Sequence, residues 1–180
     1  MAETWTAALL QEQREKEHAA RLLTRHVTDS ATLVQHGTTT SGGDTRRREE
    51  RRPLVLLVDD YHDCREMYAM YLSLAGFRVV KARDGFEALA LARKERPDLV
   101  LMDLGLPGID GCEATRRLKQ DNATRDVPVV ALTAQAPLAG DLLETAGFEA
   151  VITKPCLPDE LAEQAHRFVR RRRAGAHRVA

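Results

Sequence analysis

From residue 53 onward, the chain alternates short apolar runs with longer segments of helical periodicity. The apolar runs are five to seven residues long and rich in Val, Leu and Ile, which is typical of strands buried on both faces. The segments between them repeat apolar residues at helical spacing, and several end near Gly. The pattern predicts strands at 54–58, 78–82, 98–103, 127–133 and 150–154, and helices at 64–76, 84–96, 111–120, 138–146 and 158–173.

This alternation leaves few architectures open. A strand, a helix and a second strand form a right-handed βαβ unit, and successive units build a parallel sheet with helices on both faces. We therefore expect an α/β domain with a doubly wound, five-stranded parallel sheet and five helices. Sheets of this kind bind ligands beyond the carboxyl ends of their strands, so functional residues are expected at that edge.

The segments on either side of this domain differ from it in composition. A thin apolar stripe predicts a helix within an N-terminal helical extension at 1–35, and this helix is a candidate for self-association because the stripe needs a partner surface. Residues 36–52 are rich in Gly, Ser, Thr and charge, which predicts a flexible linker. The predicted domain covers 53–170, and 171–180 are expected to be a basic, disordered tail.

Charge, hydrophobicity and cysteine content argue against several classes of protein. Residues 53–169 hold 13 Lys and Arg against 19 Asp and Glu, which argues against a nucleic-acid-binding core, and no DNA-binding domain is recognisable. No apolar run approaches the ~20 residues of a membrane helix. No secretory signal is visible, and the 3 cysteines form no CxxC pair. We therefore expect a cytoplasmic protein that does not bind membranes.

Polar residues follow or end four of the five predicted strands. They are Asp59 and Asp60 after the first strand, Asp103 at the third, Thr133 at the fourth and Lys154 at the fifth. Each is weak by itself, because adjacent Asp residues usually form a turn and a strand-end Thr or Lys usually has no special role. Together, at one edge of one sheet, they are a specific constellation. Two carboxylates about 4 Å apart repel by roughly 1 kcal/mol in water, and a cation between them would remove that cost.

The chemistry of these residue types points to phosphate. Clustered carboxylates suit Mg²⁺, which takes one or two carboxylates together with phosphate oxygens. A carboxylate can also be the nucleophile that forms an aspartyl phosphate. Transfer of a phosphoryl group then needs positive charge on its oxygens, from a metal and a lysine, and a hydrogen-bond donor.

Four stretches of the sequence carry a resemblance to a known family. "VLLVDDYHDCREMY", "VLMDLGLPGIDG", "VVALTAQA" and "VITKP" resemble the response-regulator receiver domains of two-component signalling, the CheY-like superfamily, over about residues 53–170. The resemblance implies a flavodoxin-like sheet in the order 2-1-3-4-5. It also implies a phosphorelay role, in which a sensor histidine kinase or phosphotransfer protein donates a phosphoryl group. The chain would then signal to an unknown downstream protein by contact. It would not be an enzyme, because it would carry out only its own phosphorylation and dephosphorylation.

The resemblance also implies roles at the acidic end of the site. Asp103 resembles the phospho-acceptor, which also contacts the metal. Asp60 resembles the direct Mg²⁺ ligand, and Asp59 the neighbour that acts largely through water. The backbone carbonyl of Gly105, two residues past the acceptor, resembles the third protein ligand.

The remaining positions of the resemblance concern the switch. Thr133 resembles the switch hydroxyl and Lys154 the phosphate-binding cation, and the bond from Lys154 to Pro155 is expected to be cis. One position departs from the family, which usually has Tyr or Phe three residues before the lysine. This chain has Val151 there, which has no aromatic ring to rotate with the switch hydroxyl.

Two other interpretations stay open on the sequence. Mg²⁺-dependent phosphatases with an Asp nucleophile share the sheet and the Asp, Lys and Thr residues, but they typically show a DxD motif where this chain has "DDYHD". The second is a receiver-like interaction module with atypical switching. The complete set of strand-end residues argues against a loss of phosphorylation, while Val151 leaves room for unusual signalling.

Overall fold

The structure is a computed structural model that describes residues 52–134 and 145–176. The predicted N-terminal extension, almost all of the predicted linker and most of the predicted helix at 138–146 lie outside these residues. The described residues form the α/β domain.

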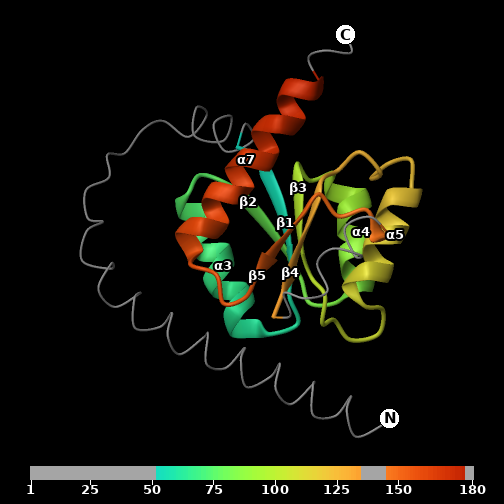
Figure 1. Cartoon of the computed structure of the whole chain (residues 1–180), viewed down its shortest axis with the longest axis horizontal. Coiled ribbons are helices and arrows are strands. Elements are labelled where there is room, and N and C mark those ends of the chain that lie inside the picture. The colour runs from blue at the N-terminus through green and yellow to red at the C-terminus, as the bar shows by residue number, and fades with distance from the viewer. Residues whose placement is uncertain (1–51, 135–144, 177–180) are drawn as a thin grey trace, which may run out of the picture. The chain divides into compact units, whose positions relative to one another are not determined.

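Five parallel strands form a single sheet, in the order β2-β1-β3-β4-β5 (Figure 1). Their bounds are β1 Leu54–Val58, β2 Arg78–Ala82, β3 Leu99–Asp103, β4 Val129–Thr133 and β5 Ala150–Thr153. The predicted flavodoxin-like, doubly wound sheet is confirmed in its strand order and its parallel pairing.

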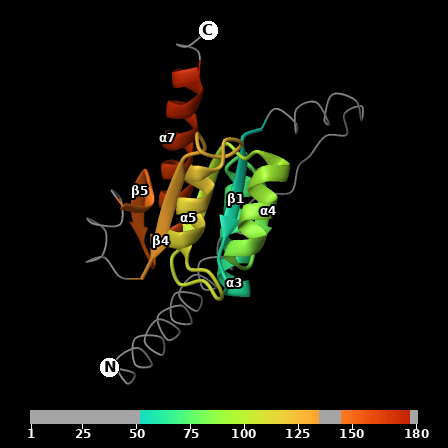
Figure 2. The same cartoon turned by 90° about the vertical axis from the view of Figure 1, so that its right-hand side faces the viewer.

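The described helices cover both faces of this sheet. They are α3 His62–Leu74, α4 Gly85–Glu95, α5 Gly111–Gln120 and α7 Pro158–Ala176. Figures 1 and 2 place α3 and α7 on one face and α4 and α5 on the other. The helix α7 continues three residues beyond its predicted end at 173, so 171–176 are helical and not part of a disordered tail. None of the described helices is long and apolar enough to cross a membrane.

The core follows from where each strand lies in the sheet. Every residue of β1, β3 and β4 is buried, because these strands are central and helices cover both of their faces. The edge strands β2 and β5 are mostly half-buried or exposed. The uninterrupted apolar runs thus belong to the three strands whose ends carry most of the predicted site.

Two helix starts are fixed by aspartate caps. Asp84 precedes α4 and accepts a hydrogen bond of 2.8 Å from the backbone N–H of Glu87. Asp110 precedes α5 and accepts one of 2.7 Å from the backbone N–H of Glu113. The cap at Asp110 holds the loop that connects β3 to α5, which is the loop next to Asp103.

Candidate functional site

The pairing of β1 with β3 brings three carboxylates together. Val58 pairs with Met102, so Asp59 and Asp103, the next residues along, lie side by side at the carboxyl edge of the sheet. Both carboxylates are almost completely buried, whereas Asp60 is exposed. One carboxylate oxygen from each of the three residues lies within 4.8 Å of the other two. The structure thus gathers the predicted acidic residues into one cluster.

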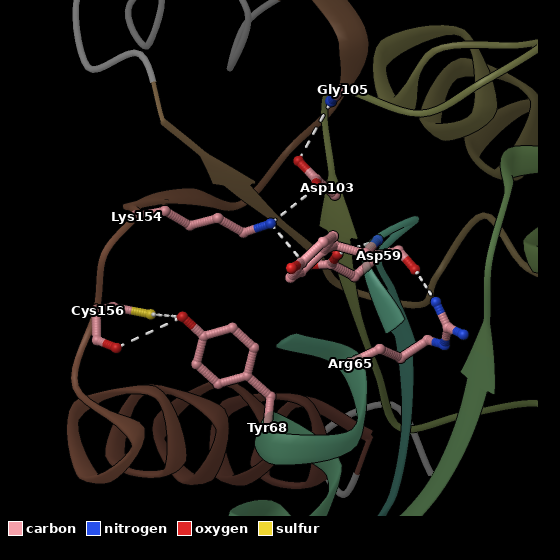
Figure 3. Close-up of polar contacts among 8 residues, drawn as sticks. Asp59, Arg65, Tyr68, Asp103, Gly105, Lys154 and Cys156 are labelled. Carbon is pink, nitrogen blue, oxygen red and sulfur yellow. Dashed lines mark hydrogen bonds and ion pairs between the residues drawn. The ribbon is translucent and has the colours of Figure 1, made fainter. Parts of the chain in front are cut away.

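Lys154 reaches into this cluster from the far edge of the sheet. Its Nζ donates to Asp59 Oδ2 at 2.7 Å and to Asp103 Oδ2 at 2.8 Å (Figure 3). The lysine is fixed along the chain because its backbone N–H donates to the carbonyl of Thr133 at 2.7 Å. The bond between Lys154 and Pro155 is cis, as predicted.

Burial and pairing act in opposite directions on these charges. Burial opposes the charge of Lys154, but its ion pairs with Asp103 and Asp59 outweigh burial and raise the pKa of the ammonium group. Burial also raises the pKa of the Asp59 carboxyl; Lys154 opposes this effect and Asp103 adds to it. One ammonium group therefore pairs with two buried carboxylates, and a third carboxylate, that of Asp60, lies beside them.

The donor atoms of the cluster fit a magnesium ion. All three side chains offer carboxylate oxygens, which are the ligands that hard divalent cations prefer. With every carboxylate ionised, three negative charges face one positive charge, so a divalent cation would neutralise the excess. The exposed position of Asp60 leaves it open to an ion that arrives from solvent.

Thr133 and Gly105 lie beside the cluster in different ways. Thr133 is the last residue of β4 and is buried. The backbone N–H of Gly105 donates to Asp103 Oδ1 at 3.2 Å (Figure 3). The contact seen at Gly105 therefore comes from its amide, and the role of its carbonyl as a metal ligand stays a prediction.

Val151 packs into the core at the position where the family usually has an aromatic ring. It pairs with Ala131 of β4 and is partly buried against the hydrophobic cluster on the α4 and α5 side of the sheet. A branched aliphatic side chain cannot make the ring rotation expected of Tyr or Phe.

Sequence reasoning missed several contacts that hold the site. Arg65 Nη1 donates to the backbone carbonyl of Asp59 at 2.6 Å, and the N–H of Tyr61 donates to Asp59 Oδ1 at 2.9 Å. On the other side of the ion pair, the hydroxyl of Tyr68 contacts Cys156. An arginine in the first turn of a helix that follows a site is a weak signal, and nothing in the sequence pairs residues 68 and 156.

Gly111, the first residue of α5, lies against the backbone at the end of β3. A Cβ atom at this position would overlap the carbonyl oxygen of Asp103 and lie 2.9 Å from Cα of Leu104. The absence of a side chain thus allows α5 to approach the end of β3. This close approach sets the backbone that carries the Asp103 side chain.

Replacing Gly111 with Ala should therefore destabilise the domain. The new methyl group meets backbone atoms that cannot rotate away, so we expect the free energy of unfolding to fall by about 1–3 kcal/mol or more. Urea denaturation measures this loss. The neighbouring substitution Cys112→Ala, at a half-buried side chain, is the control and should cost less. Equal costs for the two variants would show that the close approach is unimportant.

Comparison with known proteins identifies the family. The sequence profile of the response regulator receiver domain matches residues 55–166, more than half of the chain. The chain belongs to this family. It is therefore a receiver domain of two-component signalling, and the resemblance seen in its motifs is confirmed.

Similar sequences include both short and long response regulators. The chain is 41% identical over 103 residues to the polar-differentiation response regulator DivK of Brucella anthropi, a match that covers 56% of this chain and 83% of DivK. It is 40% identical over 119 residues to the phosphate regulon transcriptional regulatory protein PhoB of Pseudomonas aeruginosa, covering 65% of this chain and 52% of PhoB. The receiver thus matches about half the length of PhoB.

Solved structures agree with the fold. The chemotaxis response regulator CheY4 of Vibrio cholerae has a TM-score of 0.62 at 30% identity, covering 65% of this chain and 98% of CheY4. The receiver domain of the sensor histidine kinase PA1611 of Pseudomonas aeruginosa has a TM-score of 0.60 at 35% identity, covering 66% and 98%. That receiver has a magnesium ion coordinated in its active site cleft.

Proposed function

We propose that this receiver is phosphorylated on Asp103 in the presence of Mg²⁺, by a sensor histidine kinase or a phosphotransfer protein. The observation that carries the proposal is the buried Asp103 carboxylate, which has a lysine ammonium 2.8 Å from one oxygen and two other carboxylates beside it. A phosphoryl group at this point meets a positive charge already in place.

Four groups of the chain would hold the metal. They are the carboxylates of Asp59, Asp60 and Asp103 and the backbone carbonyl of Gly105. When bound, Mg²⁺ would neutralise charge on the phosphoryl oxygens. The magnesium ion bound to the PA1611 receiver supports this assignment.

The reaction itself would be a displacement at phosphorus. An oxygen of Asp103 would form the new bond to phosphorus, while the bond between phosphorus and the donor's nitrogen or oxygen breaks and its electron pair stays with the donor. Lys154 would then pair with an oxygen of the phosphoryl group, and the Thr133 hydroxyl would donate to another. These contacts would bias the loops beside the site between two arrangements, which a downstream protein could distinguish.

Exposure of the full chain to acetyl phosphate tests this function. We expect intact-mass analysis to show one added phosphoryl group when Mg²⁺ is present and none when it is chelated. Peptide mapping should place the group on Asp103. Labelling should saturate at one phosphoryl group per chain, since the chain is its own substrate and offers a single acceptor. Continuous release of phosphate from several phosphomonoesters would instead support a phosphatase, and absence of labelling would contradict the proposal.

Binding of Mg²⁺ should also stabilise the unphosphorylated protein. At a concentration tenfold above the dissociation constant, a ligand that binds only the folded state adds about 1.4 kcal/mol. For a domain of this size, that corresponds to a rise in melting temperature of about 5 °C. Differential scanning calorimetry with and without Mg²⁺ measures the shift.

The exposed carboxylate of Asp60 provides the control for this measurement. The variant Asp60→Asn should melt close to the wild type without metal, because no buried charge is removed, and it should gain much less from Mg²⁺. An equal gain in both proteins would place the ion elsewhere. No gain in the wild type would argue against the metal site as a whole.

A further inference from the structure

A polar contact joins Tyr68 of α3 to Cys156, which lies two residues after Lys154 in the segment that follows β5. The hydroxyl of Tyr68 lies 3.5 Å from the carbonyl oxygen of Cys156, and the Cys156 thiol donates to that hydroxyl at 3.4 Å (Figure 3). The two residues are 1% and 5% exposed, so no water competes freely for these groups. In the part of the chain that the structure describes, both polar contacts of this hydroxyl are with Cys156.

The same helix also contacts the backbone at Asp59. Arg65, nearly one turn before Tyr68 on α3, donates to the Asp59 carbonyl at 2.6 Å. One face of α3 therefore contacts the main chain beside Asp59 through Arg65, and the main chain two residues beyond Lys154 through Tyr68. These are the two ends of the ion pair between Asp59 and Lys154, which is 2.7 Å long.

The sheet holds the main chain at Lys154 less firmly than it holds the two aspartates. The carboxylates come from the ends of central strands, whereas Lys154 follows an edge strand with a single neighbour, β4. A lysine side chain also loses much of its rotamer entropy when it is held in one conformation. Fixing the main chain on both sides of the residue reduces the number of arrangements that its ammonium group can reach.

The chemistry of the contact suggests more than packing. Burying a hydroxyl and a thiol costs free energy unless they are hydrogen-bonded, and a purely apolar pair would avoid that cost. Burial raises the pKa of the Tyr68 hydroxyl, so it keeps its proton and remains a donor. The buried hydroxyl and thiol can therefore form a directional contact that holds the segment after β5 in one conformation.

We infer that Tyr68 and Cys156 are positioning residues that hold the segment after β5 so that the Lys154 ammonium group faces Asp103. This inference rests on the proposed phosphorylation of Asp103 and extends it. Neither side chain touches the phosphoryl group, and both act through Lys154.

The test compares labelling rates in two backgrounds. Tyr68→Phe removes only the hydroxyl, and Tyr71→Phe on the same helix is the matched control. With acetyl phosphate and Mg²⁺, Tyr68→Phe should slow labelling about three- to tenfold, the range of a coupled contact, while Tyr71→Phe leaves it unchanged. In a Lys154→Met background, Tyr68→Phe should have no further effect. An equal slowing in both backgrounds, or none in either, would overturn the inference.

A second measurement needs no phosphorylation. Urea midpoints of the wild type, Tyr68→Phe, Lys154→Met and the double variant form a cycle in which the single shifts should not add. Additive shifts would remove the proposed link between Tyr68 and Lys154. If the wild type is not labelled at all, the proposed function fails, and this cycle still decides on the positioning contact.

Variants of Cys156 keep the test valid should Tyr68→Phe fail to fold. Cys156→Ser retains a donor at the same place and should label at the wild-type rate. Cys156→Val removes the donor and should slow labelling, again only when Lys154 is present. Similar rates for the two variants would contradict a role for the thiol.

Discussion

Replacing Asp103 with Asn should abolish labelling of the chain by acetyl phosphate. Asparagine keeps the shape of the side chain, and its carbonyl oxygen can still accept the hydrogen bond from the Gly105 N–H, which is 3.2 Å long in the wild type. What it lacks is the negatively charged oxygen that, in the proposed reaction, would form the bond to phosphorus. The loss should therefore be one of chemistry, with the fold intact.

Folding and labelling must be measured on the same samples to make this result decisive. Circular dichroism and urea unfolding should show a folded Asp103→Asn protein, which also loses the repulsion between two buried carboxylates. Asp110→Asn is the matched control in the same loop, because asparagine caps a helix about as well as aspartate. That variant should label normally. Full Mg²⁺-dependent labelling of Asp103→Asn would refute the assignment of the acceptor.

The central strands could be predicted from the sequence because burial on both faces leaves a plain signal. The bounds of β1 and β2 match the prediction, whereas β3 and β4 begin one and two residues later. The reasons are local. The Asp98 side chain accepts from the N–H of Leu54, and Pro128 has no N–H to donate to a neighbouring strand.

Helix ends were harder to predict, since they depend on contacts that the sequence does not display. The helix α3 begins at His62, two residues before the predicted start, after an N-cap, Tyr61, whose side chain makes no capping bond. At the other end of the domain, Arg172 of α7 donates to the carbonyl of Pro97 at 2.6 Å. A partner 75 residues away cannot be inferred from helical periodicity.

The candidate site could also be predicted only in part. Topology alone predicts that Asp59, Asp103 and Lys154 meet, because parallel strands end at one edge. It does not predict that one ammonium group contacts both carboxylates, nor that Arg65 and Tyr68 hold the backbone on either side. Those contacts depend on side-chain rotamers and on the angle between α3 and the sheet.

Replacing Lys154 with Met should remove a large part of the stability of the metal-free domain. The lysine side chain is 6% exposed, and its partners Asp59 and Asp103 are 0% and 1% exposed. Breaking a buried ion pair by removing one partner costs about 3–5 kcal/mol, because the remaining charge is left uncompensated. Since typical domains are stable by only about 5–15 kcal/mol, the loss should be obvious in urea unfolding with a chelator present.

A surface lysine provides a control with the same contact distance but with exposed side chains. Lys81 donates to Glu66 at 2.7 Å, the distance that separates Lys154 from Asp59, but both side chains are at least 40% exposed. Surface ion pairs of this kind contribute about 0–1 kcal/mol. Lys81→Met should therefore change stability little. Comparable losses for the two variants would mean that burial does not set the strength of these pairs.

The pH dependence identifies the cause of the loss. Burial already raises the pKa of Asp59, and removing Lys154, which opposes that rise, should raise it further. A carboxyl with a higher pKa in the folded state binds protons more tightly there, so its folded form gains stability as the pH falls. The free energy of unfolding that Lys154→Met loses relative to the wild type should thus become smaller as the pH falls from neutral toward the folded-state pKa of Asp59. Saturating Mg²⁺ should reduce it too, since a divalent cation would replace the missing charge. If neither acid nor Mg²⁺ reduces this loss of stability, its cause is lost packing and not uncompensated carboxylates.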